Sequence, residues 1–313
     1  MAGARRRSGA AAVHFPARPA HSYHLVFAGE AVREWAWLDP TELAARAGRW
    51  LGERVEADLV PVVTRLIDLG DAVGLEAIER PPGPALPSVV SSSELGPARA
   101  RVDASTHVLR IDARNPAAPG VGFPGLWCAA AVAGASSSAT GGVWFDAGAL
   151  RLRPPVAPGT VVPGLGAVRM GDHLLLTQEA EVGDAVLLRT KGLGVFGLPE
   201  LSMRGVPQSL ASAAVLVLQG VAQRLVEGLL DDLRDASRRG EVPGELVVTG
   251  GHVARAATGA RVREAGAARV QLAHRVATAD DEDDHLAVEP VAIDLRRPRG
   301  EWLQLVLADL LAG

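Results

Sequence analysis

The alternation of hydrophobic and polar residues is clearest in the middle of the chain. Residues 107–112 alternate as in a strand, residues 126–138 form an alanine-rich apolar run, and residues 141–146 turn from a Gly-Gly pair into a second strand. A period of two predicts a strand, and an unbroken apolar run of this length is typical of a buried helix. The three segments together predict one β-α-β unit.

The second half of the chain combines several strands with two helices. Strands are predicted at 172–181, 184–190, 200–204, 268–278 and 285–293, and residues 245–249 are predicted to be a short strand or a turn. A long helix is predicted at 208–237, where leucine, valine and alanine recur on one side, and a closing helix at 302–311. Hairpins beside one crossover indicate an α+β fold with a mixed, largely antiparallel sheet, one β-α-β unit and a long packed helix. The strands at 107–112, 142–146 and 172–204 could share that sheet.

Composition changes along the chain suggest three segments. Residues 1–20 contain an arginine cluster but no continuous apolar stretch, and we expect a disordered leader. Residues 21–97 form an N-terminal α+β segment that ends in a proline- and serine-rich loop, which begins at Arg80. Residues 98–313 form the main α+β domain.

The bulk properties narrow the class of protein. The chain has 313 residues, 48% of them hydrophobic, and a net charge of -4, which argues against a nucleic-acid partner. The most apolar stretch, 211–230, is interrupted by Gln219, Arg224 and Glu227, so no membrane span is expected. A single cysteine, Cys128, excludes an internal disulfide and fits a cytoplasmic location.

A glycine-rich segment is the most unusual local feature. Lys191, the only lysine, precedes Gly192, Gly194 and Gly197. These glycines match the dinucleotide pattern G-x-G-x-x-G, but Pro199 and a strand-like continuation replace the helix that this pattern requires. We therefore expect a main-chain bend with positive φ angles, or a close approach by another group, and no bound cofactor.

Polar residues near this bend form a candidate site. The candidates are Lys191, Glu200, Arg204 and Asp146. Lys191 is either solvated or paired with Glu200, and no residue is predicted to be catalytic. In the alternative, a ligand or substrate pocket forms where Lys191, Glu200, Asp146, the glycines and Phe196 meet, with Glu200 as acid or base and Lys191 as an anion contact.

No metal site is predicted. The eight histidines show no zinc-binding spacing and are expected at the surface or on edge strands. They are His14, His21, His24, His107, His173, His252, His274 and His285. The acidic run Asp280–Asp284 lacks the alternating ligands and the central glycine of a calcium loop and is expected to be a solvated turn.

Two stretches carry a resemblance to a known group of proteins. One is the β-α-β unit with Leu126-Trp-Cys-Ala-Ala-Ala and Gly-Gly-Val-Trp-Phe-Asp146, and the other is Gly192-Leu-Gly-Val-Phe-Gly-Leu-Pro-Glu-Leu201. Over residues 105–235 the chain resembles uncharacterised bacterial α+β proteins grouped as a domain of unknown function. The resemblance implies a mixed α+β domain and no particular chemistry.

These observations lead to a functional expectation. We expect a non-catalytic cytoplasmic protein that acts through contacts with another protein, and an accessory role of the defence or immunity type is compatible with this. The expectation rests on the absence of a convergent catalytic set in the sequence. The alternative is a small-ligand-binding protein or enzyme with its site near Gly192–Gly197.

Overall fold

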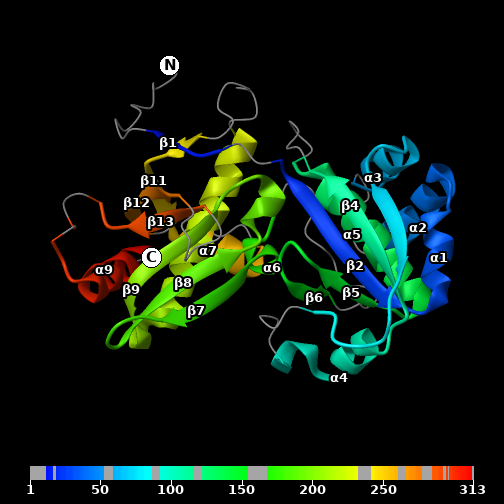
Figure 1. Ribbon diagram of the computed structural model, residues 1–313. Coiled ribbons are helices and arrows are strands. Elements are labelled where there is room, and N and C mark those ends of the chain that lie inside the picture. Colours follow the sequence, from blue (N-terminus) through cyan, green and yellow to red (C-terminus); the bar gives the residue numbers. More distant parts are fainter. Residues whose placement is uncertain are drawn as a thin grey trace, which may run out of the picture. The chain divides into compact units, whose positions relative to one another are not determined.

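The structure is a computed structural model. It describes residues 12–16, 19–52, 59–86, 92–115, 122–153, 168–231, 241–259, 266–276, 284–291, 294 and 296–311. The described chain forms two compact units, each with its own main sheet (Figure 1). Unit 1 takes its residues from 1–18, 169–193 and 198–313, and unit 2 from 19–168 and 194–197.

This division corrects the expected domain boundary after residue 97. Strands β3 (Gly74–Glu79) and β4 (His107–Arg114) lie on either side of that position and pair with each other, so both belong to unit 2. The boundaries fall instead near residues 18 and 168. The proline-rich composition before residue 97 predicted a boundary there, but a proline-rich connection can also lie within one unit.

Two further expectations for the N-terminal part need correction. The expected leader contains a strand, β1 (Ala12–His14), which pairs with β10 (Glu241–Pro243) in unit 1. The expected proline- and serine-rich loop ends in a helix, α4 (Ser92–Asp103). Residues 1–11, 17–18 and 87–91, which complete these two segments, lie outside the described residues.

Unit 2 is built on a five-stranded antiparallel sheet with the order β3-β4-β2-β5-β6. Its remaining elements are β2 (His21–Ala28), η1 (Glu30–Val32), α1 (Arg33–Ala36), α2 (Pro40–Gly52), α3 (Leu59–Asp68), α5 (Pro124–Thr140), β5 (Val143–Asp146) and β6 (Arg151–Arg153). Both β4 and β5 run antiparallel to β2, so the predicted β-α-β unit exists with β2 between its two strands. The path β2, β3, β4, β5 with two helical crossovers is the ferredoxin-like arrangement.

Helix α5 forms the centre of the unit 2 core. Its alanines pack with α2, α3 and one face of the sheet, while α4 lies against the other face. Pro124 begins the helix, and Gly141 ends it with a φ of 63°. These are the preferred positions of proline and glycine at helix ends, so the helix boundaries follow directly from the sequence.

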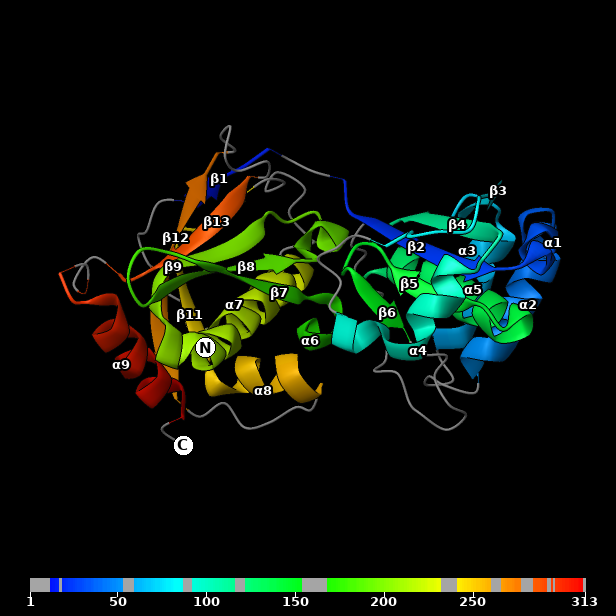
Figure 2. The same ribbon diagram turned by 60° about the horizontal axis from the view of Figure 1, so that its bottom comes forward.

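Unit 1 is built on a six-stranded sheet with the order β11-β12-β13-β9-β8-β7. Its elements after β1 are α6 (Met170–His173), β7 (Leu175–Ala180), β8 (Ala185–Lys191), β9 (Glu200–Pro207), η3 (Gln208–Leu210), α7 (Ala211–Asp231), β10, β11 (Glu245–Thr249), α8 (Gly250–Thr258), β12 (Ala267–Arg275), β13 (His285–Glu289) and α9 (Arg299–Leu311). Among the described strands, β13 and β9 are the one pair that runs in parallel. Helices α7, α8 and α9 lie on the same side of this sheet (Figure 2).

Helix α7 supplies most of the helical core of unit 1. Val217, Leu218, Val221 and Leu225 are buried along one side of it. By length and composition alone the window Gln208–Leu230 could cross a membrane, but 56% of it is buried inside the protein, as in a core helix.

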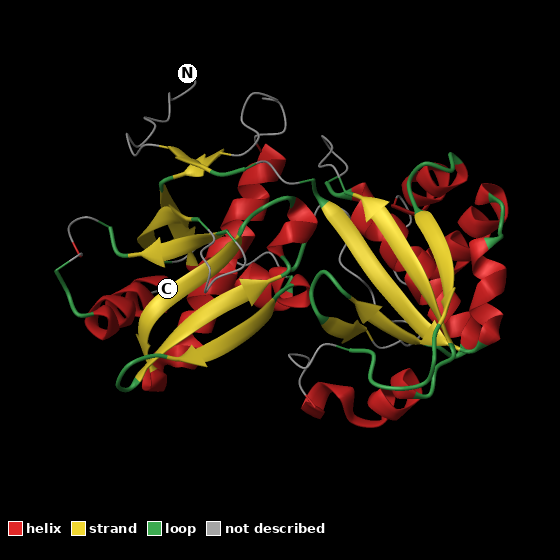
Figure 3. Cartoon of the chain, viewed as in Figure 1, coloured by secondary structure: helices red, strands yellow, loops and turns green. Residues whose placement is uncertain are grey.

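The predicted fold class is confirmed, since the described chain is α+β with mixed and antiparallel sheets (Figure 3). The expectation that the strands at 107–112, 142–146 and 172–204 share one sheet is wrong. The first two lie in the sheet of unit 2 and the later ones in the sheet of unit 1. Alternation marks a strand but does not indicate its pairing partner.

Candidate functional site

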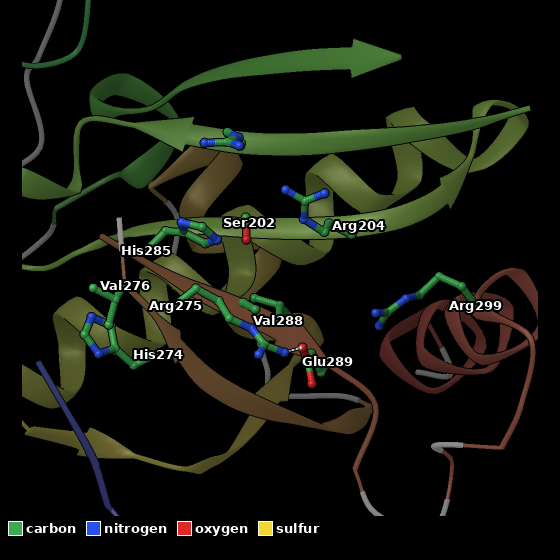
Figure 4. Close-up of a pocket in the computed structure, with 11 residues that line it drawn as sticks. Ser202, Arg204, His274, Arg275, Val276, His285, Val288, Glu289 and Arg299 are labelled. Carbon is green, nitrogen blue, oxygen red and sulfur yellow. Dashed lines mark hydrogen bonds and ion pairs between the residues drawn. The ribbon is translucent and has the colours of Figure 1, made fainter. Parts of the chain in front are cut away.

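A cavity of about 550 Å³ lies in unit 1 over the neighbouring strands β12, β13, β9 and β8 (Figure 4). Its lining residues are Arg189, Ser202, Arg204, His274, Arg275, Val276, His285, Ala287, Val288, Glu289 and Arg299. Most of these side chains alternate with core residues such as Leu188, Met203 and Leu286, so they project from the sheet face opposite α7. The volume lies in the range of pockets that hold small molecules.

Small side chains form the floor of the cavity. The strand register places Arg189, Ser202, Ala287 and Ala273 in one row across β8, β9, β13 and β12. Because neighbouring strands are only about 4.8 Å apart, short side chains in the middle of a row leave a hollow that longer neighbours enclose. Ser202, which is 1% exposed, contributes the hydroxyl group of this floor.

Cationic side chains surround the hollow, and Glu289 is the one carboxylate among the described residues that line it. Arg275 donates from Nη2 to Glu289 Oε1 at 2.6 Å. Arg189 Nε lies 3.6 Å from Glu179 Oε1, and Glu179 is more than half exposed. A guanidinium has five N–H donors, so Arg275, which pairs with Glu289 through one nitrogen, can also donate to a second anion.

Arg299, at the start of α9, has the least ordinary environment of these cations. Its guanidinium lies 5.2 Å from the centre of the Trp302 ring, and its buried Nη1 has no hydrogen bond to the described part of the chain. Burial lowers the pKa of Arg299, while Glu289 and Glu181 act in the opposite direction. A guanidinium keeps its charge at neutral pH, so a poorly solvated cation faces the cavity. Figure 4 shows Arg299 pointing from its helix toward Glu289.

Two histidines complete the polar lining. His285 is 7% exposed and lies in register between Glu200 on β9 and Arg275 on β12. His274 Nε2 lies 3.9 Å from Asp284 Oδ2. Their positions correct the expectation of surface histidines, because His285 is buried in a central strand. Imidazole N–H groups can donate to an anion beside the guanidinium groups.

The residues predicted around the glycine bend lie in different surroundings. Arg204 lines the cavity and donates to Glu181 at 3.1 Å. Glu200 accepts hydrogen bonds from Thr190 Oγ1 at 2.8 Å and from the Gly192 amide at 2.9 Å. Its carboxylate therefore links β9 to the end of β8 and the start of the bend. Lys191 lies at the end of β8, opposite Leu175, and is not among the cavity-lining residues.

Asp146 belongs to unit 2, whereas Lys191, Glu200 and Arg204 belong to unit 1. Within unit 2 it accepts from Arg153 Nη2 at 2.8 Å and from the Ala149 amide at 3.0 Å. Two partners occupy this carboxylate in a local turn. The four predicted residues thus come from both units, and the single polar site formed by them stays a prediction.

The three glycines also differ from one another. Gly192 has a φ of 129°, and a Cβ added to it would overlap the main-chain oxygen of His173. Gly197 has a φ of 75°, whereas Gly194 has no positive φ and no atom within 4 Å of an added Cβ. The group that approaches Gly192 is thus the protein's own backbone. In unit 2, Phe196 packs edge-on against Phe123 with ring centres 4.9 Å apart.

A buried histidine in unit 2 leads to a prediction about pH. Trp144 Nε1 donates to His24 Nδ1 at 3.2 Å, and the buried Nε2 atom has no hydrogen bond to any residue that the structure describes. Burial lowers the pKa of His24, with Asp146 acting against this. His24 therefore binds a proton less readily in the folded state than in the unfolded state, where its pKa has the ordinary value of 6.5.

We therefore expect the free energy of unfolding to fall as the pH drops below about 6.5, by at most about 1.4 kcal/mol per pH unit from this group. Urea unfolding at pH 7.5 and pH 5.5 measures the loss in wild type and in His24→Gln. The variant should lose less stability between the two pH values. An identical loss in both proteins would show that His24 does not contribute.

Comparison with known proteins gives no match: no family model fits the sequence, and no curated protein or solved structure is significantly similar to it. The resemblance over residues 105–235 therefore stays a prediction.

The cavity residues other than Arg204 were missed in the sequence. One signal was available, because Ser202 lies between Leu201 and Met203 in a predicted strand. What the sequence does not show is that β9 pairs with β13, about 80 residues further along the chain.

Proposed function

We propose that the protein acts by binding, and that the cavity of unit 1 holds an anionic group of its partner. The observation that carries the proposal is the row of small floor residues enclosed by four arginines and two histidines, with Glu289 as the one carboxylate among the lining residues that the structure describes. Guanidinium groups stay charged and match the oxygens of carboxylates and phosphates. They bind anions well and transfer protons poorly, which favours binding over acid-base catalysis.

A protein is the partner that we propose. Beyond the cavity, the same sheet face presents Arg269 and Val247 opposite each other, and Val276 at the cavity rim is 68% exposed. Interfaces commonly combine such apolar contacts with polar groups. A small ligand alone would use the cavity and leave this face without a role.

The proposed compartment is the cytoplasm. Cys128 is the only cysteine and is buried, and burial raises the pKa of its thiol to about 12. A buried thiol of this kind is inert and acts as a small core residue, so the protein needs no oxidising environment.

A cavity-filling variant tests the proposal. The full-length protein is titrated by calorimetry with acetate, succinate, sulfate and inorganic phosphate at constant ionic strength. We expect at least one of these oxyanions to bind at a single site with a Kd below about 1 mM. Ala287→Leu places a large side chain on the cavity floor and should weaken that binding at least about tenfold, or about 1.4 kcal/mol.

Ala267→Leu is the matched control, because it makes the same change on the same sheet face at the far end of β12. It should leave oxyanion binding unchanged. The proposal fails if no oxyanion binds, or if both leucine variants bind as wild type does.

A further inference from the structure

We infer that the anion held by the unit 1 cavity is a phosphate monoester. This inference rests on the proposed function and names the ligand class of the same site. The first argument is the direction of the donors: Arg189, Arg204, Arg275 and Arg299 come from β8, β9, β12 and α9. Figure 4 shows Arg275 and Arg299 pointing toward Glu289 from opposite sides.

A carboxylate has two oxygens in one plane, which a single guanidinium fork can satisfy. The cavity already contains one arginine–carboxylate pair, since Arg275 donates to Glu289 through one hydrogen bond of 2.6 Å. A second carboxylate would need one further arginine, and three others line the cavity. Donors from several directions suit the three terminal oxygens of a phosphate monoester, which carries a charge of about -1.5 to -2 at pH 7.

The floor of the cavity supports the same class of ligand. Ser202 is 1% exposed, and its hydroxyl can rotate to donate to an oxygen above it. His285, 7% exposed, lies on the next strand, and Figure 4 shows the two side chains next to each other. A hydroxyl and an imidazole below a ring of guanidinium groups provide donors of three geometries for one tetrahedral group.

Arg299 adds a reason for a ligand with more than one negative charge. Its Nη1 is buried without a hydrogen bond to the described residues, and its neighbours Glu289 and Glu181 already pair with Arg275 and Arg204. A desolvated guanidinium gains most from an anion that brings its own charge into the cavity. A dianion can pair with Arg299 while also contacting Arg189.

The test compares ligands of different charge and shape on the full-length protein by calorimetry at pH 7.5 and constant ionic strength. Inorganic phosphate should bind at least about tenfold more tightly than acetate or succinate. Arg189→Gln and Ser202→Ala should each weaken phosphate binding several-fold while the far-ultraviolet circular dichroism spectrum and the thermal midpoint stay close to wild type. Two variants are used so that the loss of one to misfolding leaves the other to decide.

The outcomes separate the two proposals. Equal or tighter binding of carboxylates would overturn the phosphate assignment and leave the anion-binding function standing. Binding of no oxyanion at all would overturn both. A short phosphoserine peptide and glycerol phosphate form two further arms: tighter binding of the peptide identifies a protein as the source of the phosphate, and equal binding identifies a small phosphate ester.

Discussion

Replacing Gly192 with alanine is expected to destabilise the protein by about 3 kcal/mol. Two independent costs add at this position. A φ of 129° is open to glycine but strained for any residue with a Cβ, at about 1–2 kcal/mol. The new methyl group would also overlap the main-chain oxygen of His173, and relieving such a collision typically costs about 1–3 kcal/mol.

The collision is expensive because neither partner can move freely. The Gly192 amide donates to Glu200 at 2.9 Å, and the same carboxylate accepts from Thr190 at 2.8 Å, so the bend is fastened to β9. His173 ends helix α6, and its oxygen belongs to the main chain. Chemical unfolding of the full-length protein, followed by circular dichroism, measures the effect.

Gly194 provides a matched control two residues away in the same glycine-rich segment. It has no positive φ, and an added Cβ would meet no atom within 4 Å. Gly194→Ala should therefore change the free energy of unfolding by no more than about 0.5 kcal/mol. Equal losses in the two variants would mean that the segment is sensitive to any side chain, and the specific account of Gly192 would be wrong.

Local patterns predicted the elements of this protein well. The segments 107–112, 126–138 and 141–146 correspond to β4, α5 and β5, whose ends lie within a few residues of the prediction. Each of these elements is determined by a strong local signal: regular alternation, a continuous apolar run, or proline and glycine at the ends of a helix. The short strand β1 gave no such signal, because three residues cannot establish a period and its pairing with β10 defines it.

The candidate site could be predicted only in part, because it depends on pairing and not on spacing. Arg204 was identified through its closeness to the glycines, yet the cavity needs β9 beside β13 and β13 beside β12. The parallel pair aligns His285 with Glu200, and no local pattern contains that register. Asp146 was grouped with Lys191 although it lies in unit 2, since sequence reasoning had no means of separating the units.

The second large stability effect is expected at Gly134 in α5, where the helix core allows glycine only. A Cβ added there would overlap atoms of the Trp50 indole ring from α2. Trp50 is 8% exposed and packs edge-on against Trp144, with ring centres 6.0 Å apart, so the indole cannot turn away without disturbing the core. Alanine is the better helix former by about 1 kcal/mol, which opposes the collision.

We expect Gly134→Ala to destabilise the protein by about 2 kcal/mol net, because overpacking in a dense core outweighs the gain in helix propensity. The sign should reverse when the obstacle is removed. In a Trp50→Leu background, the same substitution should be neutral or stabilise by up to about 1 kcal/mol. The four proteins form a double-mutant cycle with an expected coupling of about 2–3 kcal/mol, measured by urea unfolding.

The cycle separates packing from helix propensity, which act in opposite directions at this one position. If Gly134→Ala stabilises the protein in the wild-type background, then Trp50 does not press on α5 and the close approach of α2 to α5 is incorrect. If it destabilises equally in both backgrounds, the obstacle is a group other than the indole. One outcome supports the packing account: Gly134→Ala destabilises the protein when Trp50 is present and does not destabilise it in the Trp50→Leu background. Gly134 is then required because Trp50 packs directly against α5.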